Sequence, residues 1–185
     1  DILMVGEMRD GETASIGLRG ALTGHLVLST LHTNDAITSA LRLLDMGAEG
    51  FLVGSALKAV LAQRLVRRIC VNCVTDASPT DEEKLWLSRL MDRSVEQDHF
   101  KQGQGCQSCG YTGYRGRIGV FELLEMNEPM MAALKRGDNE AFIKHARAHP
   151  GYKPLSHAAF DYATTGVTTI KEVLRLADTI DMSPS

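Results

Sequence analysis

Residues 1–10, DILMVGEMRD, decide the fold, because an apolar run ends there at a glycine and a charged residue. Near-continuous apolar runs are typical of buried strands in parallel α/β sheets. Ligands gather at the carboxyl ends of such strands. We therefore expect Ile2 to Val5 to form a buried strand. Glu7, just beyond it, stands where an NTPase places the group that handles a water molecule beside a γ-phosphate.

The residues that follow predict a helix and then a second strand. Asp10 is suited to cap a helix that runs to about Leu22 and stops at Gly24. Gly17 and Gly20 lower helix propensity, so we expect another segment to approach the helix closely there. The apolar triplet at residues 26–28 predicts a second buried strand.

Two helices are predicted next. Residues 33–47, TNDAITSALRLLDMG, have helical apolar spacing, with Thr33 or Asn34 as the cap and Gly47 as the end. Residues 51–69 carry leucines and valines at helical spacing and predict a longer helix. Its basic C-terminal residues suit the helix dipole, and they either offset a nearby thiolate cluster or form a solvated helix end; they are Arg64, Arg67 and Arg68.

The second half of the chain predicts a polar insert, a strand and several helices. Residues 74–105 are polar around one short helical segment, KLWLSRLM, and GYTGYRGRIGVFELLEM predicts a turn followed by a strand. A capping box, Thr169 to Glu172, begins the last helix. The order indicates an α/β fold, a partial sheet with an appended helical region.

Composition excludes several classes of protein. The chain has 185 residues, 44% hydrophobic and 23% charged, and a formal net charge of −3. These values are ordinary for a globular protein and give no basic footprint for nucleic acid or for a membrane surface. No apolar run is long enough to cross a bilayer. The chain starts directly at a strand, so we expect that a natural N-terminal part is missing.

Four cysteines form two CxxC pairs, Cys70 with Cys73 and Cys106 with Cys109. Each pair can place two thiolates on one tetrahedral Zn²⁺. Without a secretion signal, disulfides are the weaker interpretation. We expect one structural zinc ion, with a redox or unmetallated state as the alternative. The 32 residues between the pairs predict a small folded insertion on the metal.

The chain lacks the loop that would hold phosphates. The motif GxxxxGK[ST] cradles phosphates with backbone amides and a lysine, but none of the lysines here is followed by Ser or Thr. We expect this loop to lie upstream. His25 and His32 flank the second strand, and an imidazole at a strand end can donate to a phosphate oxygen. Positions seven apart face opposite sides of a regular strand, so both serve one site only if His32 lies beyond the strand.

The string VGEMRDGETASIGLRGALTGHLVLSTLHTNDA closely resembles the Walker B and His-box region of the secretion ATPase superfamily. AQRLVRRICVNC, the paired CxxC motifs, GYRGRIGVFELLEM and GVTTIKEVLRL extend the resemblance almost to the C-terminus. The cysteines favour the type II secretion and type IV pilus extension branch, because retraction motors generally lack them. The chain is thus similar to the C-terminal portion of such a motor.

The resemblance implies a partial RecA-like P-loop NTPase core without its Walker A half, at residues 1–69. It implies a tetracysteine zinc subdomain at 70–115, and a closing strand with a helical region at 116–185. Glu7 becomes the Walker B glutamate that activates water, with Arg9 in the same box. His25 and His32 become the His-box residues near phosphate. Catalysis is thus assigned to Glu7, Arg9, His25 and His32, and nucleotide contact to Glu7 and His32.

The resemblance also implies a setting. Such motors are cytoplasmic homo-hexamers at the inner membrane that use ATP and Mg²⁺ to drive pilus assembly or protein secretion through a membrane platform protein. Because the Walker A half is missing, we expect the chain alone to be inactive. The alternative is a non-enzymatic, zinc-stapled interaction module. A zinc-ribbon nucleic-acid binder fits poorly with the acidic net charge and the 5% aromatic content.

Overall fold

The computed structural model describes the backbone of residues 1–181 and the side chains of residues 1–177. The described chain forms two compact units. Unit 1 comprises Asp1–Ala62 and Glu122–Tyr152, and unit 2 comprises Gln63–Phe121 and the chain from Lys153 onward. Each unit therefore consists of two separate stretches of the sequence. The three consecutive domains expected at 1–69, 70–115 and 116–185 divide the sequence in a different way and stay a prediction.

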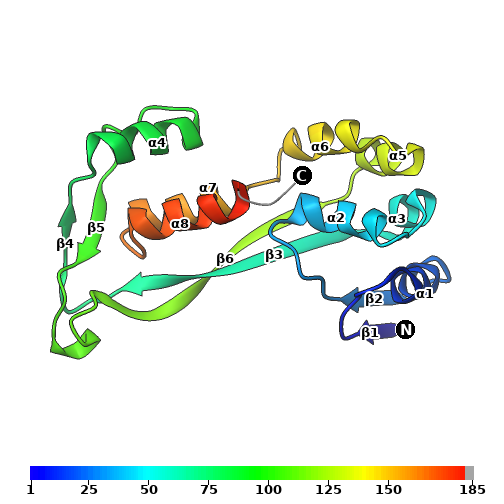
Figure 1. Cartoon of the computed structure of the whole chain (residues 1–185), viewed down its shortest axis with the longest axis horizontal. Helices are drawn as coiled ribbons and strands as arrows, with labels where there is room; N and C mark the ends of the chain where they lie inside the picture. The colour runs from blue at the N-terminus through cyan, green and yellow to red at the C-terminus, as the bar shows by residue number, and fades with distance from the viewer. Residues whose placement is uncertain (182–185) are drawn as a thin grey trace. The chain divides into compact units, whose positions relative to one another are not determined.

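Unit 1 contains a short parallel sheet and five helices (Figure 1). Its elements are β1 (Ile2–Val5), α1 (Gly11–Leu22), β2 (Leu26–Ser29), α2 (Ala36–Asp45), α3 (Gly50–Ala56), α5 (Glu128–Arg136) and α6 (Asn139–Arg147). The sheet pairs β1 with β2 in parallel, from Ile2 opposite Leu26 to Val5 opposite Ser29. Parallel pairing brings the carboxyl ends of both strands to one edge.

Helix α1 lies against β2 of this sheet (Figure 1). A Cβ atom added at Gly20 would lie 3.5 Å from the Leu3 side chain and 3.7 Å from that of Val27. The predicted cap is confirmed, because the Asp10 side chain accepts from the N–H of Thr13 at 2.8 Å. The distances at Gly20 are ordinary van der Waals distances, so the packing does not require a glycine at position 20, whereas a Cβ atom at Gly17 would lie only 2.5 Å from the Met8 side chain.

The expectation that β1 and β2 are buried strands was wrong for the described chain. Ile2, Met4, Leu26 and Leu28 are all exposed, Met4 by 77%. Burial of a strand depends on what packs on both of its faces, and here α1 packs on the sheet while the outer side chains have no cover among the described residues.

The core of unit 1 lies among its helices. Helix α2 begins after Asp35, whose side chain accepts from the N–H of Thr38 at 2.7 Å, so the cap is Asp35 and not Thr33 or Asn34. Helix α3 packs closely on α5: a Cβ atom at Gly50 would lie 2.4 Å from the carbonyl oxygen of Leu134. The fully buried residues of this core include Ala14, Val53, Leu124, Met130, Leu134 and Phe142.

Two long strands run through both units, β3 (Ala59–Ile69) and β6 (Tyr114–Glu125), and they pair with one another. The strand at β6 was predicted, but the helix expected at residues 51–69 was wrong. The helical part of this segment is α3, which ends at Ala56, and residues 59–69 form the strand β3, with Leu61 and Leu65 exposed. The basic residues therefore do not form a helix end.

Unit 2 combines a hairpin-like pair of strands with three helices (Figure 1). Its remaining elements are β4 (Val74–Ala77), α4 (Asp81–Met91), β5 (Phe100–Gly103), the 3-10 helix η1 (Gln107–Cys109), α7 (Leu155–Thr164) and α8 (Ile170–Asp181). Strands β4 and β5 pair antiparallel, from Val74 opposite Gly103 to Ala77 opposite Phe100. Phe100 also packs edge-on to Phe160, with ring centroids 5.9 Å apart. Among the described residues, no helix combines the length and apolar character that crossing a membrane requires.

Thr169 directly precedes α8, and the two residues expected to form its capping box have partners far away in the sequence. The Glu172 carboxylate is fully buried and accepts from the backbone N–H of Arg67 at 2.8 Å and from its guanidinium at 2.8 and 3.0 Å. The Thr169 hydroxyl instead bonds the hydroxyl of Tyr114 at 2.8 Å. These long-range bonds join α8 to β3 and β6 within unit 2.

Candidate functional site

The candidate site lies at the carboxyl edge of the parallel pair β1–β2. Glu7 follows β1 by two residues, and His32 follows β2 by three. Two hydrogen bonds continue the pairing past the strand ends: the Thr30 hydroxyl donates to the carbonyl oxygen of Gly6 at 2.7 Å, and the N–H of Met8 donates to the carbonyl oxygen of Thr30 at 3.0 Å. The two loops are therefore held side by side.

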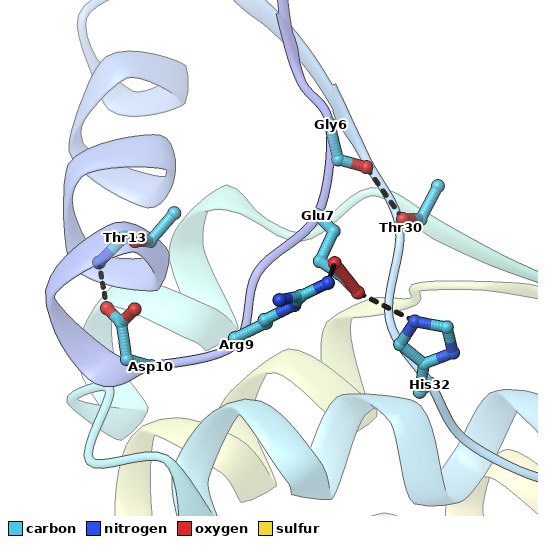
Figure 2. Close-up of a pocket in the computed structure, with 7 residues that line it drawn as sticks. All are labelled: Gly6, Glu7, Arg9, Asp10, Thr13, Thr30 and His32. Carbon is cyan, nitrogen blue, oxygen red and sulfur yellow. Dashed lines mark hydrogen bonds and ion pairs between the residues drawn. The ribbon is translucent and has the colours of Figure 1, made fainter.

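Both oxygens of the Glu7 carboxylate are engaged (Figure 2). Nε2 of His32 lies 2.6 Å from Oε1, and the Arg9 guanidinium pairs with Oε2. The approach of His32 is not aligned as a hydrogen bond, so we describe it as a contact at ion-pair distance. The structure thus brings together three of the four residues to which the family resemblance assigned catalysis.

The electrostatics of the cluster keep Glu7 ionised. The bond from Arg9 lowers the pKa of the Glu7 carboxyl, and the nearby His32 lowers it further, while partial burial opposes both. In turn, the carboxylate raises the pKa of the Arg9 guanidinium. Opposite charges within a few ångströms favour the charged form of each group. Glu7 is therefore a carboxylate at neutral pH.

A pocket of about 570 Å³ opens beside these side chains, and Figure 2 shows the residues around it. It is lined by Gly6, Glu7, Arg9, Asp10, Thr13, Thr30 and His32. The side chains of Arg9 and His32 are 77% and 88% exposed, whereas that of Glu7 is 21% exposed. A fixed carboxylate next to two exposed nitrogen donors can orient a water molecule beside an anionic group.

His25 lies apart from this cluster. It precedes β2, at the amino end of the strand, and its Nδ1 lies 3.2 Å from the carbonyl oxygen of Gly20 and 3.2 Å from the Thr23 hydroxyl. Only His32 lies beyond the carboxyl end of the strand, which is the position that strand geometry required for a shared site. The structure therefore does not bring His25 to Glu7.

Sequence reasoning missed Thr30 and Thr13 as residues of the pocket. Thr30 follows β2 directly, and its hydroxyl fastens the Glu7 loop to the His32 loop through Gly6. Thr13 lies in the first turn of α1 and donates its N–H to Asp10. The signal for Thr30 was its place between an apolar run and a histidine, in STLH.

The four cysteines converge in unit 2. Cys70 and Cys73 follow β3, Cys106 precedes η1, and Cys109 is the last residue of η1. All four are free thiols, and their sulfur atoms lie within 4.8 Å of one another. Sequence spacing had predicted this convergence, although it did not show the strands β4 and β5 that lie between the pairs.

The sulfur positions fit a tetrahedral metal ion. Cys70 to Cys106 and Cys73 to Cys109 are both separated by 3.9 Å between Sγ atoms, and Cys106 to Cys109 by 3.8 Å. Zinc–sulfur bonds of about 2.3 Å in a tetrahedron place sulfurs about 3.8 Å apart. Thiolates are also the ligands that Zn²⁺ prefers, so the donor set and its geometry both fit zinc.

The backbone around the cysteines stabilises thiolate charge. The N–H groups of Gly105, Cys106 and Gly113 donate to sulfur atoms at 3.2–3.3 Å. The N–H of Cys106 is the main cause that lowers the pKa of Cys109 to about 6, whereas burial raises that of Cys73 to about 11. A bound cation would favour the thiolate form of all four.

Comparison with known proteins matches most of the chain to one protein family. Residues 1–175 match the family model described as type II/IV secretion system protein. The chain is 44% identical over 174 residues to the type IV pilus assembly ATPase PilB of Thermus thermophilus, covering 94% of this chain and 20% of that protein. It is 42% identical over 178 residues to the type II secretion system protein E of Klebsiella pneumoniae, covering 96% and 35%.

Solved structures share the fold. The Legionella pneumophila ATPase DotB superimposes with a TM-score of 0.63 at 20% identity, over 96% of this chain and 38% of that one. The pilus retraction motor PilT with bound ADP superimposes with a TM-score of 0.61 at 21% identity, over 100% and 40%. The mixed α/β fold expected from the sequence is thus confirmed.

Proposed function

The chain belongs to the type II/IV secretion system protein family, and from this membership we propose that it is part of an ATP-hydrolysing motor for protein secretion or pilus assembly. It spans between 20% and 35% of the length of the two curated relatives described above. The activity is therefore proposed for a whole protein that contains this sequence. ATP with Mg²⁺ is its substrate complex.

The contact between Glu7 and His32 is the observation that carries this proposal. In phosphoryl transfer to water, catalysis consists mostly of positioning and of electrostatic stabilisation. Glu7 is an ionised carboxylate that can accept a hydrogen bond from the attacking water and orient it. His32 and Arg9 are exposed donors that can turn to γ-phosphate oxygens. Mg²⁺, when bound, supplies neutralising charge at the phosphates.

This assignment extends to the RecA-like nature of the core, in which β1–β2 and the helices of unit 1 form the half that carries Walker B and the His box. The parallel pairing of β1 with β2 supports it, as does the position of the pocket at the carboxyl edge of these strands, where ligands bind in parallel sheets. A role for His25 at the nucleotide stays a prediction, because its ring is bonded to Gly20 and Thr23 in this chain. If His25 contacts the nucleotide, it would do so at a part of the nucleotide other than the γ-phosphate that Glu7 faces.

The tetracysteine cluster is proposed to hold one structural Zn²⁺. Cys70, Cys73, Cys106 and Cys109 fill all positions of a tetrahedron, which leaves no open position for a substrate. The zinc would fasten the end of β3 to the start of β6. We further propose a cytoplasmic homo-hexamer at the inner membrane, working on a membrane platform protein and without nucleic acid, as membership of this family suggests.

Substitution of the glutamate tests the proposed chemistry. In the full-length protein, Glu7→Gln keeps the size of the side chain but removes its negative charge. We expect ATP to remain bound and hydrolysis to fall by roughly 10²–10⁴-fold, the usual contribution of a positioned acid–base group. Wild-type turnover in this variant would remove Glu7 from the mechanism.

The second candidate function concerns the chain by itself. In this alternative, the 185-residue chain is a zinc-stapled interaction module without enzymatic activity, since its sequence contains no GxxxxGK[ST] motif. Titration of the chain with Mg-ATP separates the two cases. We expect no saturable binding and no hydrolysis, and saturable binding would contradict the need for a GxxxxGK[ST] loop.

A further inference from the structure

A buried carboxylate in unit 1 lies outside the pocket and has no part in the proposed chemistry. Glu122, in β6, is only 1% exposed. Its Oε1 accepts the backbone N–H of Ala36 at 2.8 Å and the hydroxyl of Tyr152 at 2.8 Å. A buried charge is costly unless it is bonded in this way, so its retention in a core position calls for a reason.

The bond to Ala36 places this carboxylate at the start of α2. Ala36 is the first residue of the helix and is fully buried. The first N–H groups of a helix have no partner within the helix, and a negative charge is favoured there by the helix dipole. Asp35 serves the N–H of Thr38, so Glu122 serves a different N–H of the same turn.

The segment that Glu122 holds is the one that carries His32. Only residues 31–35 separate Thr30, which is bonded to the Glu7 loop, from Ala36. The His32 side chain is 88% exposed, so packing of the ring itself does not fix its place. Its place therefore depends on how this short loop is held: by the bonds at Gly6 and Met8 on one side, and on the other side by α2, where the Thr33 hydroxyl bonds that of Ser39 and Glu122 holds the N–H of Ala36.

We propose that Glu122 is a positioning residue for His32, acting through the N–H of Ala36 to hold the loop that brings the imidazole to Glu7. The bond to Tyr152 fixes the carboxylate in turn. Tyr152 stays a hydrogen-bond donor, because burial and the Glu122 charge raise the pKa of its hydroxyl. The functional meaning of this inference rests on the proposed role of the Glu7–His32 pair in hydrolysis.

The test measures the contact between Glu7 and His32 in the nucleotide-free 185-residue chain. The ring ¹H–¹³C resonance of His32 is assigned by its loss in His32→Gln. Glu7→Gln should move this resonance, because it removes the charge at 2.6 Å. The size of this shift in the His32 resonance is then compared among variants that keep or break the hydrogen bond from the N–H of Ala36 to Glu122.

Two backgrounds break the link from opposite sides. Glu122→Leu removes the acceptor, and Ala36→Pro removes the donor at the first helical position, where proline is tolerated. Asp35 has φ −148° and ψ 175°, an extended conformation compatible with a following proline. We expect the His32 response to Glu7→Gln to be largely lost in both. If Glu122→Leu does not fold, Ala36→Pro decides alone.

Two further backgrounds serve as controls. Glu122→Gln keeps an oxygen acceptor, and Phe142→Leu disturbs the same core but removes neither the donor nor the acceptor of the Glu122–Ala36 bond. Both should keep the wild-type response. The proposal is overturned if Ala36→Pro keeps the full response, if Phe142→Leu loses it equally, or if Glu7→Gln does not move His32 in the wild type. Because no nucleotide is present, these outcomes are separate from a failure of the proposed hydrolysis, which the turnover of Glu7→Gln reports.

Discussion

Nε2 of His32 lies 2.6 Å from Oε1 of Glu7, although the two residues belong to different strand–loop connections. The parallel register of β1 and β2 produces this contact, because it brings both carboxyl ends to one edge. The bond between Thr30 and Gly6 then fixes the two loops together. A charged acceptor and an exposed imidazole therefore share one pocket, and the account of hydrolysis depends on that arrangement.

The pKa of Glu7 should depend on Arg9. Arg9 is the largest cause of its lowered pKa, so Arg9→Gln should raise the pKa toward the ordinary value of 4.5. The carboxyl would then take up its proton at a higher pH than in the wild type. A ¹³C NMR titration of the Glu7 carboxyl measures this.

Arg19→Gln is the matched control, since Arg19, in the helix α1 that follows Arg9, pairs with Glu49 at 3.6 Å and not with Glu7. It should leave the Glu7 titration unchanged. An unchanged midpoint in Arg9→Gln would show that the ion pair does not exist in solution.

Metal removal should loosen one part of unit 2. We expect about one Zn²⁺ per chain by elemental analysis under reducing conditions. Chelation, or Cys109→Ser, should raise amide hydrogen exchange at residues 70–115, because the metal joins the two CxxC segments. Protection at β1 and β2 should stay unchanged. Absence of metal from reduced protein would contradict the zinc proposal.

The stability of unit 2 should depend on pH through Glu172. Burial raises its pKa, but the backbone N–H and the guanidinium of Arg67 outweigh this, so the pKa lies below the ordinary 4.5. A lowered folded-state pKa contributes stability above about pH 4.5 that is lost as the pH falls through the folded-state value. Glu172→Gln should therefore lower the free energy of unfolding by about 1.5–3 kcal/mol at pH 7.

Urea unfolding at pH 7 and at pH 3 measures this difference. The gap between wild type and Glu172→Gln should shrink at the lower pH, whereas Glu125→Gln, at an exposed position in β6, should have no effect at either pH. A gap of equal size at both pH values would mean that the ionised carboxylate is not what stabilises the unit.

Local patterns predicted the elements near Glu7 and the cysteines. The apolar run before Gly6, the cap at Asp10 and the CxxC spacing each depend on neighbours in sequence, and all three are found in the structure. The failure at residues 59–69 has the opposite cause. Leu57, Val60, Leu61 and Leu65 fit helical spacing, but the strand is selected by its partner β6, which is distant in sequence.

Burial and the choice between the histidines also depended on distant groups. Exposure of Met4 and Leu28 depends on what covers the sheet, which an apolar run does not reveal. His25 and His32 look alike in the sequence, and only the strand bounds show that one precedes β2 and the other follows it. Glu122 gave no signal, because its partner Ala36 contributes only a backbone N–H.

A double-mutant cycle of ATP hydrolysis in the full-length protein tests the central claim most directly. It compares Glu7→Gln, His32→Gln and the double variant, with His99→Gln as an exposed histidine control. If the two residues act as one unit, the double variant should lose no more activity than the more impaired single variant. Losses that multiply, or a His32→Gln enzyme as active as His99→Gln, would contradict a shared site.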